Sequence, residues 1–269
     1  MNVDIKDLSY PEKYDAYVLT VKRGLQVIAH FDFEGLENCN DMKSPISSKG
    51  GLNAFVHSRS TATRKANDLL GVAHPIVLDE GSPFESGTAS CSLGGAEQRW
   101  INILCSDGNP LLKNSVEFVV SMDVNKFGGS WLFCASKNQR LNPYLKESYI
   151  GVHAYDDGKL IVERYSNGRE GAIGPEGMFG KGWNKYALIV RQNSTALYMN
   201  EKLVDLSPTT NAKRFSLPIL FGADGGYVSF GKGNWTSEHG YYGEFFDGLI
   251  DNIRIYAKFD DNKLFKENL

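Results

Sequence analysis

The densest group of residues suited to ligand contact lies in a glycine-rich segment from Gly231 to Phe246. Aromatic rings stack on the apolar faces of sugars, while neighbouring polar groups bond the sugar hydroxyls. The segment offers both kinds of side chain, and the predicted ligand-binding set is Asn234, Trp235, Glu238, His239, Tyr241 and Tyr242. Two alternatives stay open for this exposed loop. One is a subunit interface, where Trp and Tyr are also enriched, and the other is ordinary packing of Phe245 and Phe246.

His153 and Tyr155 form the best pair for acid–base chemistry, because residues two apart on a β-strand share one face. A polar pair on the solvated face of an antiparallel strand is common without function. Acyl transfer is not supported, since the sequence has no G-x-S-x-G elbow for a serine nucleophile. We therefore expect no catalytic residues.

The four cysteines are Cys39, Cys91, Cys105 and Cys134. None belongs to a C-x-x-C pair, and none has a histidine at zinc-finger spacing, which argues against a metal cluster. The last three lie in apolar, alternating contexts. These contexts favour buried free thiols, with one disulfide as the alternative.

The composition excludes some classes of partner. A net charge of -3 gives no basic footprint for nucleic acid, while 42% hydrophobic residues can form a sizeable core. The N-terminus carries charge and proline where a secretory signal needs an uninterrupted apolar run. No run approaches the roughly 18 apolar residues of a membrane helix. We expect neither a signal peptide nor a membrane partner.

Short runs of apolar and β-branched residues, bounded by Gly, Asn, Asp or Pro, predict strands along most of the chain. The predicted strands are Leu25–Phe33, Thr88–Leu93, Trp100–Cys105, Asn114–Val124, Ser130–Ala135, Asn184–Arg191, Thr195–Met199 and Gly248–Ala257. Two alternating runs around Asp156-Asp157-Gly158 predict a hairpin over Ser148–Tyr165. Between Ser58 and Ser86 the pattern weakens, and a partly irregular excursion is expected.

Strict alternation along the closing strand predicts two faces. Ile250, Asn252 and Arg254 would lie on one face, and the other face would carry Leu249, Asp251, Ile253 and Ile255. One set would face the opposite sheet, and the other would face outward.

These short strands, with turns at intervals of roughly 8 to 12 residues, predict one all-β domain, a two-sheet antiparallel β-sandwich or jelly roll. We assign residues 25–260 to this domain. Residues 1–24 form a lead-in with a short helix over Tyr14–Arg23, and residues 261–269 form a C-terminal tail. The absence of βαβ alternation and of a glycine-rich phosphate loop argues against nucleotide binding.

Three segments resemble, in the right order, the laminin-G-like branch of the concanavalin A-like lectin and glucanase superfamily. They are Phe31–Gly35, the pair Trp183–Val190 and Ala196–Val204, and Phe246–Tyr256. The resemblance implies a concanavalin A-like jelly roll. Glucan hydrolases of that superfamily carry E-x-D-x-x-E, which this sequence lacks, and its lyases use a Tyr/His pair with an arginine. A lyase or hydrolase is therefore the least favoured function.

Many laminin-G-like domains hold calcium where the opening loop meets the closing strand. The resemblance carries this cofactor to Glu34, Asp41 and Asp251, with Asp32 and Asn38 as lesser candidates. The family loop usually has aspartate where this chain has Glu34. Loop capping and turn hydrogen bonds are the alternative role for these residues.

The resemblance implies a non-catalytic, lectin-like protein that recognises a glycan or surface polysaccharide. The alternative is a structural, decoration or assembly protein of a phage particle that contacts other virion or surface subunits. The segment before the sandwich resembles what precedes such domains in some phage structural proteins. The expected location is extracellular or on a virion surface.

Overall fold

The computed structural model describes residues 25–34, 46–47, 53–57, 76–78, 80–94, 99–104, 110–129, 131–137, 149–154, 160–165, 169–173, 182–191, 194–208, 226–232 and 245–259. These residues form strands and turns, with no helix among them. Within these ranges no helix is long and apolar enough to cross a membrane. The predicted lead-in helix, Tyr14–Arg23, lies outside the described residues.

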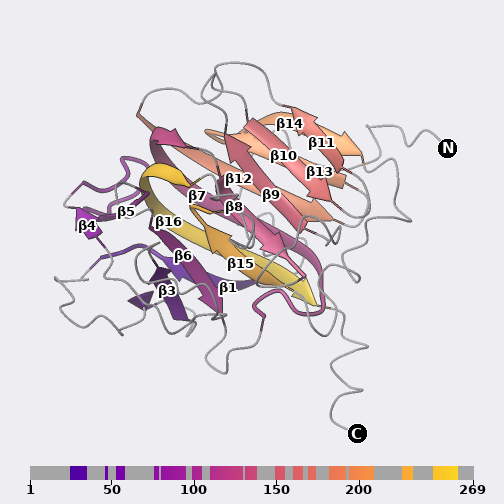
Figure 1. Cartoon of the computed structure of the whole chain (residues 1–269), viewed down its shortest axis with the longest axis horizontal. Coiled ribbons are helices and arrows are strands. Elements are labelled where there is room, and N and C mark those ends of the chain that lie inside the picture. The colour runs from indigo at the N-terminus through magenta and orange to yellow at the C-terminus, as the bar shows by residue number, and fades with distance from the viewer. Residues whose placement is uncertain are drawn as a thin grey trace, which may run out of the picture.

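The strands form two antiparallel sheets (Figure 1). Sheet A runs in the order β14 (Lys202–Pro208), β13 (Ser194–Met199), β12 (Trp183–Arg191), β7 (Ser115–Gly129), β16 (Phe246–Phe259), β5 (Ser90–Leu93) and β4 (Ile76–Leu78), and β1 (Gln26–Phe31) also pairs with β16. Sheet B runs in the order β11 (Arg169–Ile173), β10 (Leu160–Tyr165), β9 (Tyr149–Ala154), β8 (Trp131–Ser136), β15 (Tyr227–Phe230), β6 (Trp100–Leu104), β3 (Asn53–His57) and β2 (Ile46–Ser47). The predicted all-β sandwich is confirmed.

The core lies between the sheets because alternate residues of each strand point to the same side. Phe118 of β7 in sheet A meets Phe133 of β8 in sheet B, with ring centroids 6.2 Å apart. Phe133 also meets Phe230 of β15 at 5.5 Å. All three side chains are fully buried. The predicted hairpin is confirmed as β9 and β10, which pair from Tyr149 opposite Tyr165 onward.

The prediction of strict alternation along the closing strand is wrong. In β16, Asp251 pairs with Asp123 and Arg254 pairs with Ser121, so two residues of β16 stand opposite one residue of β7. Asn252 lies in this bulge with φ of 48°, a left-handed conformation that asparagine tolerates. The extra residue puts Ile250, Ile253 and Ile255 together in the core. Asp251 and Arg254 consequently lie on the outer face of sheet A.

Candidate functional site

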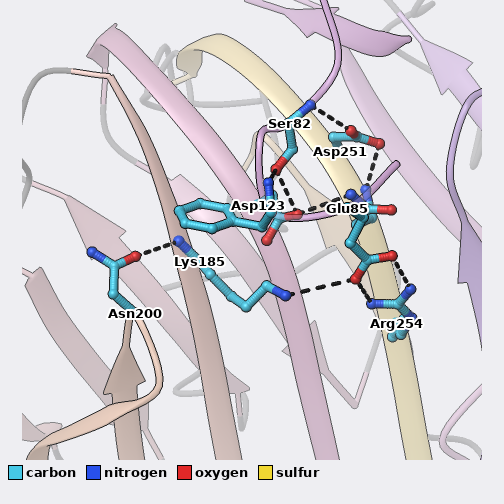
Figure 2. Close-up of polar contacts among 9 residues, drawn as sticks. Ser82, Glu85, Asp123, Lys185, Asn200, Asp251 and Arg254 are labelled. Carbon is cyan, nitrogen blue, oxygen red and sulfur yellow. Dashed lines mark hydrogen bonds and ion pairs between the residues drawn. The ribbon is translucent and has the colours of Figure 1, made fainter. Parts of the chain in front are cut away.

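A loop between β4 and β5, residues 80–89, is held against the outer face of sheet A (Figure 2). The backbone N–H of Ser82 donates to Asp251 Oδ2 at 2.9 Å, and its hydroxyl donates to Asp123 Oδ2 at 2.8 Å. Asp123 belongs to β7 and Asp251 to β16, so one serine joins the loop to two neighbouring strands. We call residues 80–89 the crossing loop.

The bulge supplies two further donors to these carboxylates. The N–H of Asn252 donates to Asp251 Oδ1 at 2.7 Å, and the Asn252 side-chain amide donates to Asp123 Oδ2 at 2.9 Å. Without the extra residue, the Asn252 side chain would point into the core. The bulge therefore adds two donors to a buried polar network that includes both aspartates.

The two aspartates lie directly opposite each other and are both buried. The pKa of Asp251 is raised to about 6, chiefly by burial; the backbone hydrogen bonds from Ser82 and Asn252 oppose the rise, and the nearby carboxylates of Asp123 and Glu34 add to it. Burial also raises the pKa of Asp123, although Ser82 and Asn252 donate to it. Like charges that face each other across strands are unfavourable. This cluster therefore favours a proton or a cation.

Glu34 extends the acidic cluster from the end of β1. Its Oε1 accepts the backbone N–H groups of Thr88 at 2.6 Å and Ala89 at 2.7 Å, and its Oε2 accepts the Thr88 hydroxyl at 3.2 Å. A Cβ on Gly87 would lie 2.8 Å from Glu34 Oε1 and 4.0 Å from Asp251 Oδ2. Both carboxylates thus border one small space, which the missing side chain of Gly87 leaves open.

The structure brings together two of the five predicted calcium residues, Glu34 and Asp251. Each oxygen of Asp251 accepts one of the described hydrogen bonds and retains a second lone pair. Oxygen ligands suit calcium, so this pair fits the ion as part of a ligand set. Asp41 and Asn38 lie outside the described residues. Among the described residues, no group of three or more His, Cys, Asp or Glu side chains could hold a metal ion.

A second cluster of functional interest lies on the outer face of sheet B. The Trp131 ring packs edge-on to His153 with centroids 4.9 Å apart, and to Tyr149 at 6.0 Å. Gly151 lies beneath the indole, because a Cβ there would lie 3.0 Å from Trp131 Cε3. The structure therefore places His153, the predicted acid–base candidate, against Trp131. Tyr155 lies outside the described residues.

The described residues also position both ends of the predicted binding loop. The N–H of Phe246 donates to the Gly231 carbonyl at 3.0 Å, and Phe245 bridges to Trp131. Phe245 packs against Trp100 with centroids 5.7 Å apart. The described residues that flank segment 233–244 therefore lie side by side next to Trp100 and Trp131. The six predicted ligand residues, Asn234, Trp235, Glu238, His239, Tyr241 and Tyr242, lie outside the described residues.

Lys232 adds a cation beside these aromatic residues, with its ammonium 4.5 Å from the Trp100 ring centroid. Lys232, Trp100 and Trp131 were not among the site residues predicted from the sequence. Trp100 precedes the core residues Ile101 and Ile103, and alternation along that strand was the available signal for an outward tryptophan.

Buried Cys91 and Cys134 are free thiols, as predicted.

No protein-family model and no curated protein matches the sequence. Solved structures do match. The chain is similar to domain 4 of AbnA, a GH43 extracellular arabinanase from Geobacillus stearothermophilus, in complex with arabinotriose. The identity is 17% and the TM-score 0.54, over 87% of this chain and 93% of that one.

Structures of botulinum neurotoxins are also similar. For the binding domain of botulinum neurotoxin DC in complex with rat synaptotagmin II, the identity is 11% and the TM-score 0.51, over 90% of this chain and 51% of that one. For a structure of botulinum neurotoxin type C, whose cell entry depends on interaction with two ganglioside molecules, the identity is 13% and the TM-score 0.50, with the same coverage. The chain spans about half the length of these toxin structures. At such identities, the likenesses establish the β-sandwich fold alone.

Proposed function

We propose that this protein is a non-catalytic carbohydrate-binding protein that acts on a cell or particle surface. The observation that carries the proposal is that Lys232 and Phe245, the residues on either side of segment 233–244, both lie against Trp100. A loop with fixed ends can hold aromatic and polar side chains at a constant spacing, which favours affinity. The similar arabinanase domain binds arabinotriose, which supports a saccharide as the partner.

In this proposal, Trp235, Tyr241 and Tyr242 stack on sugar rings, and the other predicted residues bond the hydroxyls. The proposal includes no hydrolysis, because the E-x-D-x-x-E spacing of glucan hydrolases is missing from the sequence. The specificity belongs to the loop, because the sandwich itself serves many unrelated functions.

The loop assignment predicts that a Trp235→Ala, Tyr241→Ala double variant loses glycan binding while keeping its fold. Loss of two stacking rings should weaken binding at this loop by at least about 100-fold, since well-placed aromatic anchors dominate such contacts. The measurement is a screen on arabinan, glucan, galactan and mannan oligosaccharides and their uronate- or sialate-bearing counterparts, followed by calorimetry. Val27→Ala, at an exposed position on β1, is the control. Failure of the parent protein to bind any glycan would overturn the proposal.

We further propose that calcium binds beside Glu34 and Asp251, where it would offset the charge of Asp251, whose described hydrogen bonds come from neutral backbone N–H groups. Ligands from the segment after Glu34, including Asp41, would complete the set. The ion would hold the crossing loop against the end of β1 and the middle of β16.

Calcium should therefore raise the melting temperature. At a calcium concentration of about 100 Kd the gain is about 2.7 kcal/mol, or roughly 5 to 10 °C for a domain of this size. Differential scanning calorimetry with calcium or EDTA measures it. Asp251→Asn should abolish the gain, and Asp247→Asn, at an exposed position on the same strand, should preserve it. Equal gains in the two variants would exclude the site.

A protein partner is the second candidate, because a similar sandwich-containing toxin domain forms a complex with synaptotagmin II, a protein. In this alternative the predicted binding loop, segment 233–244, which we call the aromatic loop, contacts other subunits of a phage particle or surface assembly. Light scattering at rising concentration distinguishes the two proposals. Self-association lost in the Trp235→Ala, Tyr241→Ala variant, with no glycan bound by the parent, would favour assembly.

A further inference from the structure

Phe84 is an exposed aromatic residue on the crossing loop. It is 40% exposed, and the other exposed large apolar side chains of the described part are Val27 and Leu78. Apolar residues in a fixed loop are usually turned inward, since burial of their surface stabilises the fold. A ring that is kept outward on an anchored loop therefore marks a candidate contact surface.

The crossing loop is anchored on both sides of Phe84. On one side, Ser82 binds Asp123 and Asp251, and its hydroxyl also accepts the N–H of Phe84 at 3.2 Å. On the other side, the carboxylate of Glu85 accepts hydrogen bonds from both terminal nitrogens of Arg254 (Figure 2). These contacts fix the backbone beneath the ring. Phe84 is thus presented in one place, without an ordering cost when a ligand binds.

Polar side chains surround the ring at the same surface. The Lys185 ammonium lies 5.6 Å from the Phe84 ring centroid and 3.6 Å from Glu85 Oε1. The side chains of Lys185, Glu85 and Arg254 are 19%, 27% and 23% exposed, so each still reaches solvent. The backbone N–H of Lys185 donates to Asn200 Oδ1 at 2.9 Å, which fixes the strand that carries the ammonium.

The charges of this patch compensate one another. Lys185 and Arg254 are cations, and Glu85 and the buried Asp123 are carboxylates. An aromatic face beside a carboxylate and an ammonium suits a ring with vicinal hydroxyls, because the carboxylate accepts O–H groups and the ammonium donates. The balanced charge gives no preference for an anionic sugar.

We propose that Phe84, Lys185 and Glu85 form a second saccharide subsite, on the outer face of sheet A, that takes a neutral sugar ring. This inference rests on the proposed carbohydrate-binding function. The subsite is separate from the aromatic loop, because β16 runs from Phe246 at the end of that loop to Arg254 in the patch, roughly 26 Å away at the rise of an extended strand. The protein would bind two sugar rings at different points.

The test uses the neutral oligosaccharide that gives the strongest signal among the arabinan, glucan, galactan and mannan probes. Calorimetry of the parent should show two binding sites per chain. Phe84→Ala should remove one site, with at least a tenfold loss of its affinity, and Phe84→Trp should retain it. Leu78→Ala is the matched control, because Leu78 is 38% exposed on neighbouring β4 and lies outside the subsite. Thermal melting of each variant verifies its fold.

The loop double variant, Trp235→Ala with Tyr241→Ala, separates this inference from the proposed function. It should retain the Phe84 site alone. If Phe84→Ala leaves both the number of sites and their affinities unchanged while the double variant loses binding, the second subsite is wrong and the proposed function stands. If the parent binds no probe, both are wrong. Stronger binding of uronate-bearing probes at the Phe84 site would overturn the preference for a neutral ring.

Discussion

Replacement of Gly151 by alanine should lower the free energy of unfolding by about 3 kcal/mol, because the new methyl group has no space. It would lie 2.9 Å from the carbonyl oxygen of Phe133 and 3.0 Å from Trp131 Cε3. The carbonyl belongs to the paired strand β8. The indole is buried against His153 and Tyr149 and cannot move without disturbing them. Urea denaturation of parent and variant measures the loss.

Gly128→Ala is the matched control for this substitution. Gly128 also lies within a paired strand, β7, but a Cβ there would have its nearest neighbour at 3.9 Å, an ordinary contact. The variant should match the parent or gain up to about 1 kcal/mol from reduced freedom of the unfolded chain. A further consequence separates packing from general strain. Gly151→Ala should shift the indole N–H resonance of Trp131, and equal stabilities of the two variants would contradict the proposed packing.

The fold followed from the sequence because the strands obey local rules. The hairpin of β9 and β10 was predicted from two alternating runs and an Asp-Asp-Gly turn, and it formed as expected. Strand ends were less predictable. Gly248–Ala257 was predicted for the closing strand, which extends over Phe246–Phe259, because pairing with β7 continues beyond the apolar pattern.

The site was less predictable than the fold because its contacts join distant residues. Asp251 was predicted as a cation ligand from a family resemblance, but its partner Ser82 lies 169 residues away. Glu85 and Arg254 are separated by the same distance in sequence. Neither Ser82 nor Glu85 belongs to a motif, since both lie where the strand signal weakens. Only the folded sheet brings the crossing loop onto β7 and β16.

The bulge at Asn252 shows how one residue changed the site. Strict alternation predicted Asp251 and Arg254 on opposite faces, whereas the extra residue puts both on the outer face. A bulge leaves a weak sequence signal, here an asparagine that tolerates positive φ within an apolar strand. The acidic cluster and the proposed Phe84 subsite both depend on this shared face.

The same shared face predicts an unusual pH dependence in the absence of divalent cations. Because the pKa of Asp251 is raised from 3.8 to about 6, the folded protein binds more protons than the unfolded chain between these pH values. Stability from this group is complete below pH 3.8 and is lost as the pH rises through about 6. The raised pKa of Asp123 acts in the same direction. In EDTA, the free energy of unfolding should fall by up to about 3 kcal/mol between pH 4 and pH 7.

Asp251→Asn should reduce this fall in the free energy of unfolding, because the amide does not titrate. The expected result concerns the slope with pH and does not depend on the variant's stability at any single pH. Glu85→Gln is the informative comparison, since hydrogen bonding to Arg254 lowers the pKa of Glu85 below 4.5. Its contribution is present above pH 4.5 and is lost as the pH falls through the folded-state pKa, the opposite sign. Glu85→Gln should therefore change only the acidic side of the profile. Urea titrations at half-unit pH steps measure both, and a parent profile that rises between pH 5 and pH 7 would show that the buried aspartates do not control stability.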